Sequence, residues 1–127
     1  MTAENIFESA LKLMDAVEDA AEYSARASGI LRVLLPELQR AAGTEDTLLD
    51  VSELSYTVDL PEQLLDGVAP YGLAAHLLLE ENPALASFFQ ARYEEGLARF
   101  ERRRLAKWES ISNVYGGIEF SSFSRWT

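Results

Sequence analysis

The residue types that could support catalysis are few in this chain, and their spacing does not favour it. The single histidine, His76, stands four positions before Glu80, which places both side chains on one face of a helix. Such a pair can ligate a metal ion, but a metal site in a helical bundle draws several carboxylates and histidines from different helices. We therefore interpret His76 as a core or boundary histidine with one hydrogen-bond partner.

The other acidic pairs offer no better acid–base site. Glu80 and Glu81 are neighbours in the chain, as are Glu94 and Glu95, and neighbouring positions on a helix diverge by about 100°. The chain has no cysteine, so nucleophilic triads are nearly excluded, and no glycine-rich phosphate loop is present. These features predict a protein that is not an enzyme and that needs no cofactor, metal or small-molecule substrate.

A basic cluster is the clearest candidate for contact with another molecule. It consists of Arg99, Arg102, Arg103, Arg104 and Lys107, with Trp108 beside it. The functional interpretation is contact with a phosphate or an acidic protein, and the alternative is a solvated helix face that Glu94 and Glu101 partly neutralise. Because the net charge is −10, we expect no sequence-specific nucleic-acid binding and favour an acidic protein surface.

Charge is distributed unevenly along the 127 residues. Residues 1–82 hold 16 acidic and 4 basic residues, whereas residues 83–127 hold 5 and 7. One end of a copy can therefore attract the other end of a neighbour, although ordinary solvated faces explain the same numbers. The first five residues lack the basic start of a signal peptide, and the longest apolar stretch, 72–79, is too short for a bilayer, so we expect no membrane partner.

The apolar periodicity predicts an all-α fold, a compact bundle of about four helices. The first two helices are expected over 3–17 and 19–42, with Pro36 kinking or restarting the second. A third begins at Asp59, bends near Pro70, and is apolar on most of its circumference. Asn82 and Pro83 begin the last helix, whose polar stretch after Phe100 should project from the core or lie along a partner.

Two segments fall outside this helical pattern. In residues 44–58, Leu54, Tyr56 and Val58 alternate with polar residues, which suits a short extended arm, although a connecting loop is favoured because no second strand is evident. Residues 110–127 form an aromatic tail after a helical domain of residues 1–109. We expect this tail to be non-helical, with a possible small β-hairpin at Gly116 and Gly117.

The tail is too apolar to remain uncovered in water. Four of its last 17 residues are aromatic, against 13 of 127 in the whole chain, and disordered tails are usually poor in aromatics. We expect it to dock on its own core, on a neighbouring copy or on another protein. The candidate partner-binding residues are Arg102, Arg103, Arg104, Trp108, Tyr115, Ile118, Phe120, Phe123 and Trp126.

Several stretches resemble the small α-helical head–tail connector, or adaptor, proteins of tailed bacteriophages and prophages. They are residues 60–65 (LPEQLL), 70–79 (PYGLAAHLLL), 82–86 (NPALA) and 93–99 (YEEGLAR), about a third of the chain. Residues 113–120 (NVYGGIEF) and the terminal Arg125 and Trp126 resemble the ends of proteins from prophage structural clusters. Gly96 departs from the pattern, since alanine is usual there, and the polar extension after Phe100 has no clear counterpart.

The resemblance implies a structural virion protein that forms a ring with copies of itself between portal and tail-completion proteins. Such a protein would be made in the bacterial host cytoplasm and would end in the virion. An alternative from a different class is an acidic helical regulatory or inhibitor protein that covers a basic partner surface, motivated by the acidic residues 1–82. A small metal-dependent helical enzyme is a third class, set aside because ligands are scarce.

Overall fold

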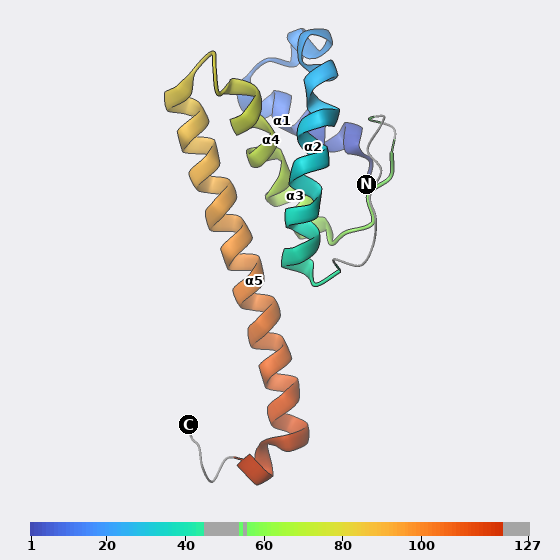
Figure 1. Ribbon diagram of the computed structural model, residues 1–127, viewed down its shortest axis with the longest axis vertical. Coiled ribbons are helices and arrows are strands. Elements are labelled where there is room, and N and C mark those ends of the chain that lie inside the picture. The colour runs from blue at the N-terminus through green and yellow to red at the C-terminus, as the bar shows by residue number, and fades with distance from the viewer. Residues whose placement is uncertain (45–53, 55, 121–127) are drawn as a thin grey trace.

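Helices make up most of the computed structural model (Figure 1). The structure describes residues 1–44, 54 and 56–120, with side chains described up to residue 106. In chain order the elements are α1 (Ala3–Met14), a 3-10 turn η1 (Val17–Asp19), α2 (Ala20–Ala42), α3 (Glu62–Gly67), α4 (Ala69–Leu78) and α5 (Pro83–Phe120). The predicted all-α fold is confirmed, with the third predicted helix divided into α3 and α4.

Helix α1 has well-defined ends. The hydroxyl of Thr2 accepts a hydrogen bond from the backbone N–H of Asn5 at 3.3 Å, which satisfies an otherwise unpaired donor of the first turn. The helix ends at Met14, three residues earlier than predicted, because Asp15 adopts a left-handed conformation with φ 56°. Its buried face packs on α4 and α2 through Ile6, Phe7, Ala10, Leu11 and Met14.

Helix α2 continues through Pro36 and does not restart there. Proline leaves the carbonyl of Arg32 without its helical partner, but both residues are exposed, so water can satisfy that carbonyl. The helix ends at Ala42, as predicted, and is followed by Gly43, where φ is 79° and glycine carries no steric penalty. The buried face of α2 comprises Tyr23, Ala27, Leu31, Leu34, Leu35 and Leu38.

The predicted bend near Pro70 is a break between two helices. Val68, with φ −123° and ψ −52°, separates α3 from α4, and Pro70 occupies the first turn of α4, where a missing N–H costs little. The predicted helix start at Asp59 is wrong. Helix α3 begins after Pro61, whose carbonyl accepts from the N–H groups of Leu64 and Leu65 at 3.0 and 3.2 Å.

Helix α4 is the centre of the core, since it packs against α1, α2 and α5. Leu73, Ala74 and Leu77 are fully buried. Gly72 faces the ring of Tyr93 on α5, and a Cβ at this glycine would stand 2.7 Å from Cδ1 of that ring. The absent side chain therefore sets how closely α5 approaches α4.

The chain before α3 lies against the N-terminus. Backbone N–H groups of Ala3 and Glu4 donate to the carbonyls of Tyr56 and Leu54 at 2.8 and 2.7 Å, and Val58 donates to Met1 at 2.9 Å. The extended arm therefore pairs with the backbone at the start of the chain, a partner that the sequence did not reveal. Within the described residues the β pairing is a single antiparallel bridge, between Thr2 and Thr57, so this arm is extended but forms no strand.

Helix α5 begins at Pro83 with Asn82 as its cap, as predicted, since the side-chain oxygen of Asn82 accepts from the N–H of Leu85 at 3.2 Å. It is longer than predicted. The backbone stays helical to Phe120, so the expected non-helical tail and hairpin are wrong over residues 110–120, and residues 121–127 lie outside the described part. In Figure 1 the second half of α5, orange to red, extends beyond all the other helices.

The close contact between Gly72 and Tyr93 predicts opposite effects for two glycine-to-alanine changes. Gly72→Ala must displace the Tyr93 ring and should lower the free energy of unfolding by about 1–2 kcal/mol, since overpacking outweighs the gain in helix propensity. Gly29→Ala, with nothing within 4 Å of its added Cβ, should raise it by about 0.5–1 kcal/mol. Urea denaturation measures both, and a stabilising Gly72→Ala would contradict this packing.

Candidate protein-binding surfaces

The predicted basic cluster does not act as one surface, because Arg104 turns toward the bundle. Its Nε donates to the carbonyl of Ala41 at 2.7 Å, at the C-terminus of α2. Its guanidinium also lies over Gly43, where an added Cβ would be 3.1 Å from Nη1 of Arg104. A cation at this place satisfies a terminal carbonyl and complements the helix dipole. Arg104, predicted to bind a partner, therefore has a structural contact in its own chain.

The other arginines of the cluster remain at the surface. Arg102 and Arg103 are exposed. Arg99 forms an exposed i,i+4 ion pair with Glu95, with 3.4 Å between Nη2 and Oε1, a type of pair that contributes little to stability. Arg102 and Arg103 thus remain candidates for contact with another molecule.

Past Arg104, α5 leaves the bundle. Leu105, the next residue, is 49% exposed, and the 16 residues from 105 to the end of α5 at Phe120 correspond to about 24 Å of helix. The predicted positions Trp108, Tyr115, Ile118 and Phe120 all fall on this helical segment. Phe123 and Trp126 lie outside the described residues.

The projecting segment continues the face that packs on the bundle. Along α5 this face carries Tyr93, Leu97, Phe100 and Arg104, of which Tyr93 is buried and the other three are partly buried. The same spacing of three and four residues then reaches Trp108, Ile111, Tyr115 and Ile118. Sequence reasoning missed this stripe because Gly116 and Gly117 suggested a turn.

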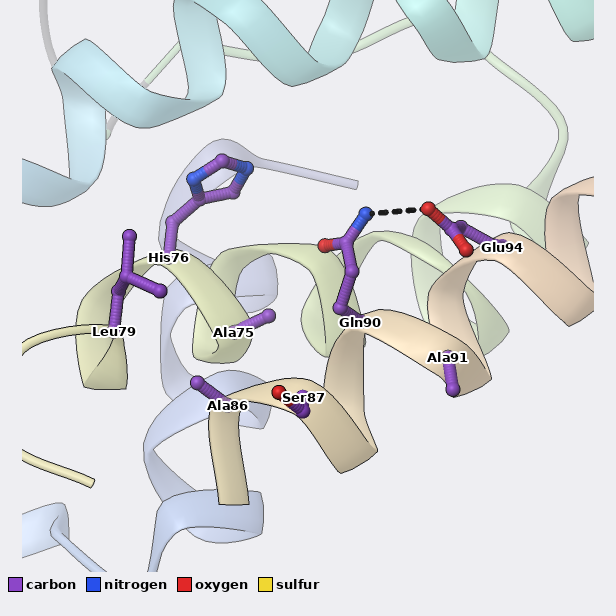
Figure 2. A pocket seen from close by; sticks show the side chains of 8 residues that line it. All are labelled: Ala75, His76, Leu79, Ala86, Ser87, Gln90, Ala91 and Glu94. Atoms are coloured by element: carbon purple, nitrogen blue, oxygen red, sulfur yellow. Dashed lines mark hydrogen bonds between the residues drawn. The ribbon is translucent and has the colours of Figure 1, made fainter. Parts of the chain in front are cut away.

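His76 was interpreted as a core or boundary residue; it is exposed, so the core alternative is wrong. It lines two hollows in the surface. One, of 370 Å³, lies between α4 and α5 and is lined by Ala75, His76, Leu79, Ala86, Ser87, Gln90, Ala91 and Glu94. The other, of 380 Å³, lies between α2 and α4 and is lined by Ala25, Arg26, Gly29, Ile30, Val33 and His76. Figure 2 shows the imidazole rising from α4 toward α2.

Half of the residues that line the first hollow are polar: His76, Ser87, Gln90 and Glu94. Gln90 donates to Oε2 of Glu94 at 3.1 Å, and both come from α5, beside His76 (Figure 2). Among the described residues, no three histidine, aspartate or glutamate side chains gather closely enough to hold a metal ion. The hollows therefore offer an occupant both apolar surface and polar side chains that can form hydrogen bonds.

Two tyrosine–carboxylate hydrogen bonds tie the helices together around these hollows. The hydroxyl of Tyr93 donates to Oε1 of Glu37 at 2.7 Å, which joins α5 to α2. The hydroxyl of Tyr23 on α2 donates to both carboxylate oxygens of Glu81, just after α4, at 3.0 and 2.8 Å. The hydrogen bond to Glu81, with burial adding to it, raises the pKa of Tyr23 to about 12. Burial, followed by the bond to Glu37, raises the pKa of Tyr93 well above its usual value.

Comparison with protein-family models, characterised proteins and solved structures finds no match for this chain. Within the part of the chain that the structure describes, no helix combines the length and the apolarity needed to cross a membrane.

The contact of Arg104 with α2 predicts a stability effect that its exposed neighbour lacks. Arg104→Ala should lower the free energy of unfolding by about 1 kcal/mol, since it leaves the Ala41 carbonyl and the helix terminus without their cation. Arg102→Ala, on the exposed side of the same turn, should change it by less than about 0.5 kcal/mol. Equal effects in thermal or urea unfolding would show that Arg104 has no such role.

The raised tyrosine pKa values predict alkaline instability. Tyrosines ionise near pH 10 in the unfolded chain, whereas Tyr23 stays protonated in the folded chain to about pH 12. The stabilisation that the protonated Tyr23 hydroxyl gives the folded chain is therefore complete below about pH 10. It is lost as the pH rises through the pKa of Tyr23 in the folded chain.

The measurement for this effect is urea denaturation between about pH 9 and 11. Tyr23→Phe and Tyr93→Phe should each show a shallower loss of stability with pH than the wild type. Tyr71→Phe, which leaves both tyrosine–carboxylate bonds in place, is the control. An unchanged slope in both test variants would contradict the assignment.

Proposed function

We propose that this protein is a non-catalytic structural subunit that works by binding copies of itself and other proteins, as a head–tail connector of a phage or prophage particle. The observation that carries the proposal is the second half of α5, which extends past the bundle with apolar positions on the face that packs the first half. A helix with an apolar face is only weakly stable when it extends alone into water, because most of its stability comes from packing that face against another surface.

The energetics favour a protein partner for this segment. Burying a large apolar side chain is worth about 1.5–3 kcal/mol, and the projecting face carries four such residues: Trp108, Ile111, Tyr115 and Ile118. Aromatic and arginine side chains are also enriched among the residues that dominate protein interfaces. Arg102 and Arg103, exposed where the helix leaves the bundle, flank this face.

The resemblance to connector proteins supports the specific assignment, and it falls on a coherent part of the fold. Residues 60–99 span α3, α4 and the first half of α5, which build the core around Gly72 and Tyr93. Gly96, where the family usually has alanine, meets Val68 closely, since an added Cβ would be 3.1 Å from its Cγ2. In this proposal the bundle is the shared body of the subunit and the projecting helix makes contacts to neighbouring copies, portal or tail-completion proteins.

A regulatory protein that covers a basic surface is the second candidate. The 16 acidic residues within residues 1–82 favour it, because such a surface attracts a basic partner over long distances. It would use the bundle and would give the projecting helix no role. Tight, salt-sensitive binding to a nucleic-acid enzyme by a chain truncated after Ala106 would favour this candidate.

Particle assembly in the cell that encodes the chain tests the connector proposal. Deleting the gene should leave heads and tails that do not join, as seen by electron microscopy after induction. Full-length protein should restore complete particles, whereas a chain lacking residues 107–127 should not, because it lacks the projecting helix.

A chain lacking only residues 121–127 is the matched control and should restore assembly at least in part. The chain lacking residues 107–127 still contains Arg104 and its contact with Ala41. An unchanged unfolding midpoint of this chain would therefore exclude misfolding as the reason that it fails to restore particles. Complete particles in the absence of the gene would refute the proposal.

A further inference from the structure

Two hollows flank His76, one between α4 and α5 and the other between α2 and α4, and we refer to them together as the groove over His76. Figure 2 shows His76 between these helices, and it lines both hollows. The Tyr93–Glu37 bond joins α5 to α2, the two helices that contribute to the hollows together with α4. Each hollow, of 370 and 380 Å³, falls in the size range that holds a bound organic group in proteins.

The groove presents more apolar surface than a solvated helix face requires. Val33 in one hollow is 64% exposed, and Leu79 in the other is 60% exposed. Leu79 follows the last residue of α4 and stays at the surface. Gly29, with nothing within 4 Å of an added Cβ, leaves room beside Val33 for an incoming side chain.

Residues 1–82, which supply α2 and α4, are strongly acidic, with 16 acidic and 4 basic residues. Glu94 lines one hollow, Glu80 and Glu81 follow α4, and Glu22 precedes Arg26 by one turn of α2. Arg26 lines the other hollow, and its guanidinium donates to the backbone carbonyl of His76 at 3.4 Å. An apolar occupant with basic flanks would therefore complement the groove better than an acidic one.

The projecting half of α5 has this chemistry. Its apolar stripe is preceded by three basic residues, Arg102, Arg103 and Lys107. The stripe includes Trp108 and Tyr115, whose side chains have a size suited to the hollows. We propose that the groove over His76 receives the projecting half of α5, residues 105–120, from a second copy of this chain. This inference rests on the proposed function and names the two surfaces through which copies meet.

A second copy must provide the helix, because α5 is continuous and carries its own second half away from its own groove. Pairing of two projecting helices with each other is less favourable when they run parallel, since it brings the arginines of one copy against those of the other. Insertion of a helix into a groove joins two different surfaces. Such head-to-tail contacts repeat from copy to copy and close into rings or continue as filaments.

Paired variants on the full-length chain test this contact. The donor variant is Ile111→Glu with Tyr115→Glu, on the apolar stripe, and its control is Asn113→Glu, on the opposite side of the helix by spacing. The acceptor variant is Gly29→Lys with Ala91→Lys, which places a long cation in each hollow. Its control, Ala21→Lys with Ala98→Lys, also introduces two lysines on α2 and α5, at exposed positions that line neither hollow.

Self-association is measured by sedimentation and light scattering up to roughly 1 mM, which reveals even weak contacts. Donor and acceptor variants should each weaken it at least roughly 30-fold, as loss of an interface hot spot does, and the controls should match the wild type. Mixing donor with acceptor variant should restore a single 1:1 heterodimer, because one intact groove and one intact stripe remain.

The outcomes separate this inference from the proposed function. Association that survives in the acceptor variant would overturn the groove assignment and leave a connector that assembles through another surface, such as paired α5 helices. A wild-type chain that stays monomeric would overturn the second copy as occupant, while the particle assay still decides the function. Donor and acceptor variants that fail to complement each other would also overturn it.

Discussion

The contact between the Tyr93 ring and Gly72 sets the geometry on which the other features depend. The ring lies where a side chain on α4 would be, and its hydroxyl reaches Glu37 on α2. Tyr93 thereby fixes α5 to two other helices. The buried ring defines how closely α5 approaches α4, and the hydroxyl bond defines the direction of α5 relative to α2. Since α5 is a single helix to Phe120, its direction at Tyr93 determines where its second half points. The Arg104 contact with Ala41 is the last described tie to α2 before the helix leaves the bundle.

The features that the sequence predicted well are those with local physical causes. The apolar spacing located the helices, including the end of α2 at Ala42, and Asn82 and Pro83 located the start of α5. Pro70 indicated the bend that separates α3 from α4. Each depends on the steric or hydrogen-bonding character of a few neighbouring residues, which one sequence displays.

The features that were missed depend on contacts between distant residues or on competing local preferences. Arg104 resembled its exposed neighbours, because nothing local shows that the α2 terminus lies beside it. The arm at residues 54 and 56–58 lacked an evident partner, which is the backbone before α1. Gly116 and Gly117 suggested a turn, whereas the spacing from Trp108 to Ile118 was helical. Glycine lowers helix stability by only about 1 kcal/mol per residue, so the apolar periodicity was the better guide.

Structure and proposed function meet in the second half of α5, which extends past the bundle, and its tryptophan offers a direct probe. In a chain carrying Trp126→Phe, Trp108 is the remaining tryptophan, and its fluorescence reports whether water surrounds it. The account predicts a shift of its emission to shorter wavelength as the protein concentration rises, and no such shift in the Gly29→Lys, Ala91→Lys variant. Emission typical of a water-exposed indole at every concentration, in a chain that nevertheless associates, would contradict the claim that the projecting helix is the surface through which copies meet.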